Sequence, residues 1–136
     1  WKEYKKFFKK NDDLKAFGCL EKILLLDPNS YTALKCEGDI FSQFKKYNEA
    51  LKRYKKCIRL DKKNGKAQNN MGNVYEKLGD YEKAKKWYNE SNDYDKLHPT
   101  GWRNMARMCQ KLHQDREAER LFDKAINLLN IKIIRA

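Results

Sequence analysis

Few residues in this sequence have the identity and separation that a catalytic or metal site requires. Cys109 and His113 lie four residues apart, so a helix would place both on one face. Two ligands are too few for a structural zinc site, and His98 falls in an expected loop. No catalytic Ser-His-acid or Cys-His arrangement and no glycine-rich phosphate loop is recognisable. The carboxylates are expected on solvated helix surfaces, where nothing raises their pKa values. We therefore expect no enzyme activity, no metal and no cofactor.

A cluster of basic residues is the second candidate site. It lies on and just after one expected helix, at Lys52, Arg53, Lys55, Lys56, Arg59, Lys62 and Lys63. Such a cluster could neutralise nucleic-acid phosphates, and its binding would then weaken steeply with salt. No exposed aromatic platform for stacking bases accompanies it, and such a run is more commonly a solvated helix face. Nucleic-acid binding is therefore kept as a lesser alternative.

The composition narrows the class of protein. The 136 residues include 31 Lys and Arg against 19 Asp and Glu, which gives a net charge of +12. Only 6 Gly and 2 Pro accompany a charged fraction of 37%, a balance that favours exposed helices over sheets. The positive charge favours an acidic partner. No apolar run is long enough to span a bilayer, so membrane insertion is not expected.

The cysteines indicate a compartment. Cys19, Cys36, Cys57 and Cys109 lie far apart and form no C-x-x-C pair. This spacing argues against zinc ribbons and disulfide scaffolds and fits a reducing environment. We expect an intracellular location, the cytoplasm first and the nucleus as the alternative. Because the chain opens on Trp1 without Met, inside an expected helix, we interpret it as a segment of a longer protein.

The elements that must position any site recur at an interval of 34 residues. One column contains alanines and a second contains large side chains: Ala16, Ala50, Ala84 and Ala118, then Leu20, Tyr54, Tyr88 and Phe122. A period of this length with two helix-like runs predicts an array of helical hairpins. We expect helices at about 1–10, 13–26, 31–44, 47–60, 65–78, 81–94, 99–112 and 115–131. The turns at Lys45-Lys46 and Gly79-Asp80 are short enough to require antiparallel neighbours.

On these columns the chain resembles the tetratricopeptide repeat (TPR) family. The third unit reads Met71-Gly72, Tyr75, Gly79-Asp80-Tyr81, Ala84 and Tyr88, and the fourth reads Trp102, Met105-Ala106, Ala118, Phe122 and Ala125. The resemblance implies an all-α fold, a right-handed α-solenoid of antiparallel helix hairpins. We expect a single array over residues 1–136, with repeats at about 1–30, 31–64, 65–98 and 99–132, and residues 133–136 starting a following element. Glu37 departs from the pattern, because its column is usually apolar.

The resemblance also implies where a partner would bind, since the first helix of each TPR hairpin lines a concave groove. Gly38, Gly72 and Ala106 set the phase. The groove residues are then basic and rich in Asn: Lys5, Lys9, Lys35, Lys66, Asn69, Asn70, Asn73, Lys77, Arg103, Asn104, Arg107 and Lys111. Lys and Arg attract carboxylates, and Asn both donates and accepts hydrogen bonds with a peptide backbone. We predict a non-enzymatic scaffold or adaptor that binds an acidic extended peptide or protein segment there.

Two TPR binding modes match only in part. Asn70 and Asn104 share one column, which resembles the asparagine ladder of O-linked N-acetylglucosamine transferases, but that ladder would have only two rungs here. The two-carboxylate clamp of chaperone-binding TPR domains matches at Lys35 and Asn70 and fails at Asp39, Thr100 and Asn104. We therefore do not expect binding to chaperone tails through that clamp.

The leading alternative function is structural. A subunit of a large assembly could contact its neighbours through the convex faces and through the apolar C-terminal end, which contains Leu128, Leu129, Ile131, Ile133 and Ile134. Nucleic-acid binding and the TPR region of a larger enzyme are the lesser alternatives.

Overall fold

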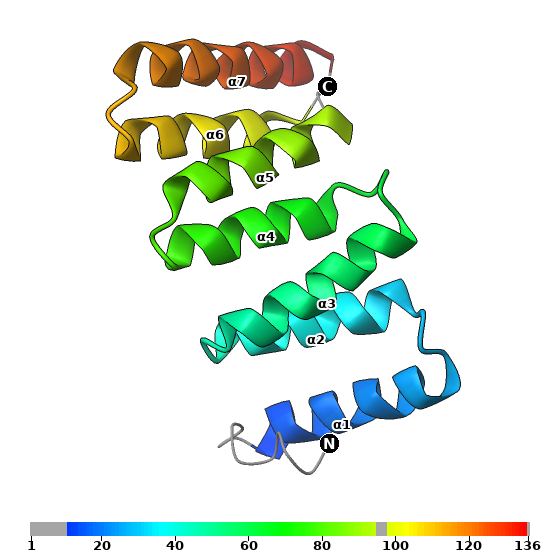
Figure 1. The fold of residues 1–136 in the computed structure, drawn as a ribbon. Coiled ribbons are helices and arrows are strands. Elements are labelled where there is room, and N and C mark those ends of the chain that lie inside the picture. Colours follow the sequence, from blue (N-terminus) through cyan, green and yellow to red (C-terminus); the bar gives the residue numbers. More distant parts are fainter. Residues whose placement is uncertain (1–10, 95–97, 136) are drawn as a thin grey trace. The chain divides into compact units, whose positions relative to one another are not determined.

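The computed structural model describes residues 11–94 and 98–135, and within these ranges all regular structure is helical (Figure 1). The helices are α1 (Asn11–Leu26), α2 (Tyr31–Gln43), α3 (Tyr47–Leu60), α4 (Lys66–Lys77), α5 (Tyr81–Tyr94), α6 (Pro99–Lys111) and α7 (Asp115–Arg135). The predicted all-α class is confirmed. The helix expected at 1–10 lies outside the described residues. The helices group into two compact units, an N-terminal unit with α1 to α3 and a C-terminal unit with α4 to α7.

The helices pair as hairpins: α2 packs on α3, α4 on α5 and α6 on α7. Each hairpin turns through a residue with positive φ, at Lys45 (62°), Gly79 (81°) and His113 (61°), which are spaced by one repeat. The backbone N–H that follows each of these residues donates back to the helix carbonyl five positions earlier. An example is the bond of 2.8 Å from Lys46 N to Phe41 O, the closing bond of a Schellman turn. The predicted turns at 45–46 and 79–80 are therefore confirmed.

Contacts between a glycine and a tyrosine fix the spacing within two of the hairpins. A Cβ atom added to Gly38 would lie 2.6 Å from the ring of Tyr54, and one added to Gly72 would lie 2.6 Å from the ring of Tyr88. Both rings are buried. The glycines therefore allow each first helix to lie directly against an aromatic ring of the second, as the small-residue column predicted.

The last helix is longer than its counterparts. Asp27 and Asp61 directly follow α1 and α3, but the equivalent position in the last repeat is Leu129, and α7 continues through it to Arg135. Residues 133–135 therefore belong to α7, which extends past the end expected at 131. Of the helices described, none is long and apolar enough to cross a membrane.

Candidate functional site

In the C-terminal unit, side-chain hydrogen bonds join α4 to α6, the first helices of two successive hairpins. Asn104 Nδ2 donates to Asn69 Oδ1 over 3.3 Å, and Arg107 Nη2 donates to Glu76 Oε1 over 2.5 Å. Residues that are about one repeat apart in the sequence therefore lie side by side. We call this the α4–α6 surface, and it comprises Lys66, Asn69, Asn70, Asn73, Glu76, Lys77, Arg103, Asn104, Arg107 and Lys111.

A chain of hydrogen bonds holds the middle of the α4–α6 surface in place. The hydroxyl of Tyr88 lies 2.6 Å from Asn73 Oδ1 and 2.8 Å from Glu76 Oε1. Burial raises the pKa of Tyr88, and the bond to Glu76 raises it further, so the hydroxyl stays neutral and acts as a donor. Arg107 Nη1 in turn donates to Asn104 Oδ1 over 3.1 Å. The network therefore runs from the buried Tyr88 outward to Asn69.

This network changes the role of several residues predicted for the groove. Asn104 is buried, with 6% of its surface exposed, and its amide already bonds to Asn69 and Arg107. The charge of Arg107 is matched by Glu76. Sequence spacing gave no sign that these polar groups would satisfy one another.

The exposed cations of the α4–α6 surface are Lys66, Lys77, Arg103 and Lys111. None of the four forms an ion pair with any residue that the structure describes. The ammonium group of Lys111 lies 5.9 Å from the centre of the Tyr81 ring. Asn70 is half-buried on the same surface. The positive charge available to a ligand therefore comes from these four side chains rather than from Arg107.

The groove residues of the N-terminal unit are only partly described. Lys5 and Lys9 lie outside the described residues. Lys35 forms an ion pair of 3.0 Å with Asp39, and Asp39 Oδ1 also accepts a hydrogen bond from Tyr54. Lys35 therefore already has a carboxylate partner. A groove shared by both units stays a prediction.

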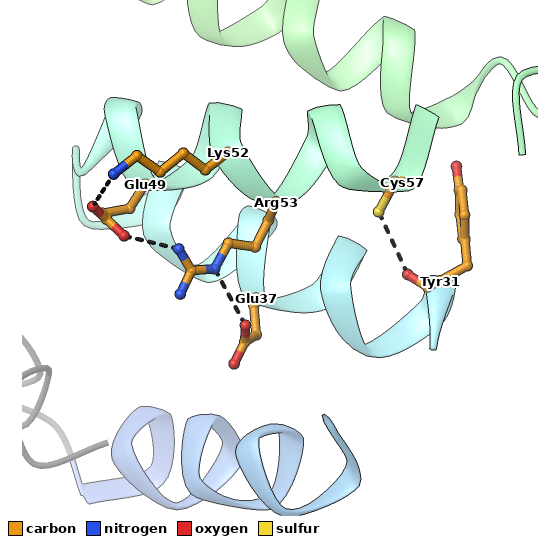
Figure 2. Close-up of polar contacts among 6 residues, drawn as sticks. All are labelled: Tyr31, Glu37, Glu49, Lys52, Arg53 and Cys57. Atoms are coloured by element: carbon orange, nitrogen blue, oxygen red, sulfur yellow. Dashed lines mark hydrogen bonds and ion pairs between the residues drawn. The ribbon is translucent and has the colours of Figure 1, made fainter. Parts of the chain in front are cut away.

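One carboxyl group, that of Glu37, is buried and does not fit the expectation that every carboxylate would be solvated with an ordinary pKa. Glu37 is only 1% exposed, and its Oε1 accepts a hydrogen bond of 3.3 Å from Arg53 Nε (Figure 2). Burial, together with the neighbouring carboxyl of Glu21, raises the pKa of Glu37 to about 8, and Arg53 opposes the shift. That expectation was wrong for this residue. The sequence did contain a signal, since Glu37 stands in a usually apolar column.

Two of the basic residues at 52–63, the cluster considered for nucleic-acid binding, form ion pairs with an acid on the same helix. Glu49 accepts hydrogen bonds from Arg53 Nη1 over 2.8 Å and from Lys52 Nζ over 3.5 Å (Figure 2). Tyr54, within the same run, is buried as its column predicted. Lys56 and Arg59 form no ion pair in the part of the chain that is described. The continuous row of available cations suggested by the sequence is therefore interrupted.

Cys109 and His113, the pair considered for a metal, do not lie on the same helix, because α6 ends at Lys111. Cys109 is fully buried in the core, whereas His113 is exposed in the turn beyond Lys111. Within residues 11–94 and 98–135, no group of three or more His, Cys, Asp or Glu side chains could hold a metal ion. All four cysteines are free thiols, and burial raises the pKa of Cys57 to about 11.

Comparison with known proteins identifies the repeat and the fold. Residues 38–79 match the model of a TPR repeat, and residues 65–98 match the model of the tetratricopeptide repeat. No curated protein matches the sequence significantly. The crystal structure of MamA has a TM-score of 0.83 at 21% identity, covering 89% of this chain and 71% of that one.

Two further solved structures are similar. MamA from Desulfovibrio magneticus RS-1 has a TM-score of 0.79 at 21% identity, covering 88% of this chain and 67% of that one. The second TPR of Spaghetti (RPAP3), bound to the HSP90 peptide SRMEEVD, has a TM-score of 0.67 at 23% identity, covering 72% and 91%. At these identities the likeness establishes a shared fold. Together with the two repeat models, which match residues 38–98, it shows that this chain contains tetratricopeptide repeats and has the helix-hairpin fold of TPR structures.

Proposed function

We propose that this protein is a non-enzymatic scaffold whose α4–α6 surface binds an extended, acidic segment of a partner protein. The observation that carries the proposal is the hydrogen-bonded network that joins α4 to α6, together with exposed cations beside it. A network fixed before binding reduces the entropy that a ligand must lose on ordering the site. Helical repeat arrays characteristically present such extended binding surfaces.

The chemistry of the surface suggests how such a segment would lie. Lys66 on α4 and Arg103 on α6 would bind its carboxylates, since charge-assisted hydrogen bonds are the stronger kind. Asn69 and Asn70 would bond to the peptide backbone, which needs both donors and acceptors. Glu76 and Arg107 match each other in charge, so they would orient the segment rather than attract it. Lys77 and Lys111 would extend the basic surface beyond this pair.

One solved neighbour supports an acidic ligand. Its bound peptide SRMEEVD has three acidic residues among seven, on a TPR fold that resembles this one. The present chain lacks the full two-carboxylate clamp, because Asp39, Thr100 and Asn104 stand where that pattern requires other residues. The proposed partner is therefore an internal acidic segment rather than a chaperone tail held by that clamp.

The test is a fluorescence anisotropy titration of a labelled peptide of repeated Ser-Glu-Gly. Lys66→Glu/Arg103→Glu should weaken binding by about tenfold or more, because two attractive contacts become repulsive. The matched control is Lys83→Glu/Lys86→Glu, which makes the same charge change at exposed positions of α5. Equal weakening in both variants would mean that only the net charge matters. No weakening in the first variant would place the site elsewhere.

A second candidate function rests on the end of α7. Leu129, Ile131 and Ile134 are exposed there, Ile134 to 84%. Such an apolar end would suit a subunit that contacts a neighbour in a larger assembly. Ile131→Asp/Ile134→Asp should then abolish recovery of that neighbour from an extract without changing the affinity for the acidic peptide. Recovery that survives this change would rule the candidate out.

A further inference from the structure

The N-terminal unit contains a pocket that the proposed function does not use. Its volume is about 330 Å³, and its walls come from all three helices and the turn after α1. The lining residues are Glu21, Leu24, Pro28, Leu34, Glu37, Lys52, Arg53, Lys56 and Arg59. We call it the Glu37 pocket, after the buried carboxyl that lines it.

The sequence of the repeat shows that Glu37 and Arg53 are unusual. One and two repeats later, the position of Glu37 is occupied by Met71 and Met105, and that of Arg53 by Trp87 and Leu121. A buried acid and a half-buried base therefore stand where later repeats have apolar residues. Such a pair seldom stabilises a fold more than well-packed apolar residues do, because desolvating both charges is costly. Departures from a local rule of this kind concentrate at functional sites.

The Glu37 carboxyl is also incompletely satisfied. Oε1 accepts the bond from Arg53, whereas Oε2 is buried without a hydrogen bond of acceptable geometry in the described part of the chain. Glu21 on α1 adds a second carboxyl next to it. These surroundings favour the protonated form of Glu37, which removes a negative charge from inside the pocket.

The outer side of the pocket is basic and one of its walls is apolar. Lys56 is half-buried and Arg59 is exposed, and neither is ion-paired to a described residue. Lys52 and Arg53 already contact Glu49. Leu24, Pro28 and Leu34 form the apolar wall. A ligand complementary to the pocket would therefore combine a carboxylate with an adjacent apolar group.

We propose that the Glu37 pocket is a second binding site, for a partner segment in which an acidic residue lies beside an apolar one. The carboxylate binds Lys56 and Arg59, and the apolar side chain contacts Leu24, Pro28 and Leu34. Protonated Glu37 keeps the interior of the pocket from repelling that carboxylate. The pocket suits a peptide better than a nucleic acid, because none of its lining side chains offers an aromatic face for a base.

Isothermal titration calorimetry on the full chain tests the site, in a Lys66→Glu/Arg103→Glu background that disables the α4–α6 surface. The probe is a capped peptide of repeated Leu-Glu-Gly, compared with Leu-Gln-Gly and Ser-Glu-Gly. Arg59→Glu should weaken binding of the probe by about tenfold, because a contact becomes a repulsion. Lys55→Glu, with the same charge change at an exposed position of the same helix, should leave the affinity within about twofold. Circular dichroism confirms that each variant is folded.

A pH comparison tests the part assigned to Glu37. The groups that face it are Glu21 from α1 and Arg53 from α3, with Lys52, Lys56 and Arg59 lining the same pocket. Affinity should fall between pH 6 and pH 9 as Glu37 loses its proton, and the fall should disappear in Glu37→Met. The same fall in both proteins would show that another group titrates and would overturn this role.

Three results would overturn the proposed site itself. Arg59→Glu could bind as well as Lys55→Glu, Ser-Glu-Gly could bind as well as Leu-Glu-Gly, or the background protein could bind no peptide at all. A single-stranded oligothymidylate that binds in place of the peptide, and is lost in Arg59→Glu, would assign the pocket to phosphates instead. Because the background already disables the α4–α6 surface, each result is independent of the proposed function.

Discussion

The Glu37 pocket and a hollow in the C-terminal unit occupy equivalent positions in the repeat but differ in chemistry. The second hollow has a volume of about 520 Å³ and is lined by Trp102 and Met105, where the Glu37 pocket has Leu34 and Glu37. Basic residues recur at the edge, since Arg120 and Lys124 stand where the N-terminal unit has Lys52 and Lys56. The ammonium group of Lys124 lies 4.2 Å from the centre of the Trp102 ring.

The comparison separates what the repeat imposes from what individual residues add. The hollow recurs at the same place in two pairs of hairpins, so it follows from how successive helices pack, whereas its basic edge depends on the residues that line it. The buried carboxyl and its Arg partner occur in one hollow and not in the other, because Met105 and Leu121 stand at the positions equivalent to Glu37 and Arg53. The repeat therefore sets where a ligand could bind, and these residues set which ligand fits.

The largest expected effect comes from replacing Glu37 and Arg53 with the apolar residue types found at the equivalent positions of the C-terminal unit, Met105 and Leu121. Glu37→Met/Arg53→Leu should raise the free energy of unfolding by about 3 kcal/mol at pH 8, since apolar residues often replace a buried ion pair with a gain in stability. Urea denaturation of both proteins measures the difference. A variant less stable than the wild type would mean that the ion pair contributes more than its desolvation costs.

The wild type and the Glu37→Met/Arg53→Leu variant should also differ in how their stability depends on pH. The pKa of Glu37 is raised from 4.5 to about 8 by folding, so between these values the folded state binds more protons than the unfolded state. Wild-type stability should therefore fall as pH rises through this window, by at most about 1.4 kcal/mol per pH unit. The variant should lack this contribution. Parallel slopes from urea denaturation at pH 5, 6.5 and 8 would contradict the assignment to Glu37.

The next prediction concerns the close contact between a glycine and a buried tyrosine ring, which occurs in both units. Gly38→Ala and Gly72→Ala should each cost about 2 kcal/mol, because the new Cβ would lie 2.6 Å from a buried tyrosine ring. Thermal unfolding measures the loss. The natural control is Ala106, which stands in the same column opposite Phe122 and already has a Cβ. If either glycine accepts alanine at no cost, the close contact is not what fixes the hairpin.

The fold was largely predictable from the sequence, whereas the site was predictable only as a set of helix faces. Columns of Gly, Ala and Tyr determine which helices meet, because their sizes must match at each contact. Ion pairs depend on distances of about 3 Å between flexible side chains, which a spacing of residues does not specify. The pairing of Arg107 with Glu76 and the burial of Asn104 were missed for that reason. The position of Glu37 was noticed, but its partner Arg53 was not.

A smaller difference is expected between the two buried tyrosines. Tyr88→Phe removes a hydroxyl bonded to Asn73 and Glu76, and it should cost about 1.5 kcal/mol. Tyr54→Phe removes only a hydrogen bond to Asp39, and Asp39 keeps its ion pair with Lys35, so this change should cost about 1 kcal/mol. Chemical denaturation compares the two variants with the wild type. The reverse order would show that the C-terminal network is the weaker one.

The smallest effect concerns the turns. Lys45→Gly and His113→Gly should each stabilise the protein by roughly 0.5–1 kcal/mol, because glycine adopts positive φ without steric cost. Gly79→Lys should lose a similar amount at the equivalent turn. Differential scanning fluorimetry measures the shifts in melting temperature. A more stable Gly79→Lys variant, or less stable Lys45→Gly and His113→Gly variants, would contradict the positive φ angles at these turns.

Chemical-shift mapping of the isotope-labelled full chain with the Ser-Glu-Gly peptide tests whether the α4–α6 surface binds an acidic segment. This peptide lacks the apolar side chain that the Glu37 pocket requires, so it reports on the α4–α6 surface alone. We expect shifts in the backbone amides of Lys66, Asn69 and Asn70 on α4 and of Arg103 and Asn104 on α6. Shifts confined to α5 and α7, with α4 and α6 unchanged, would contradict this expectation.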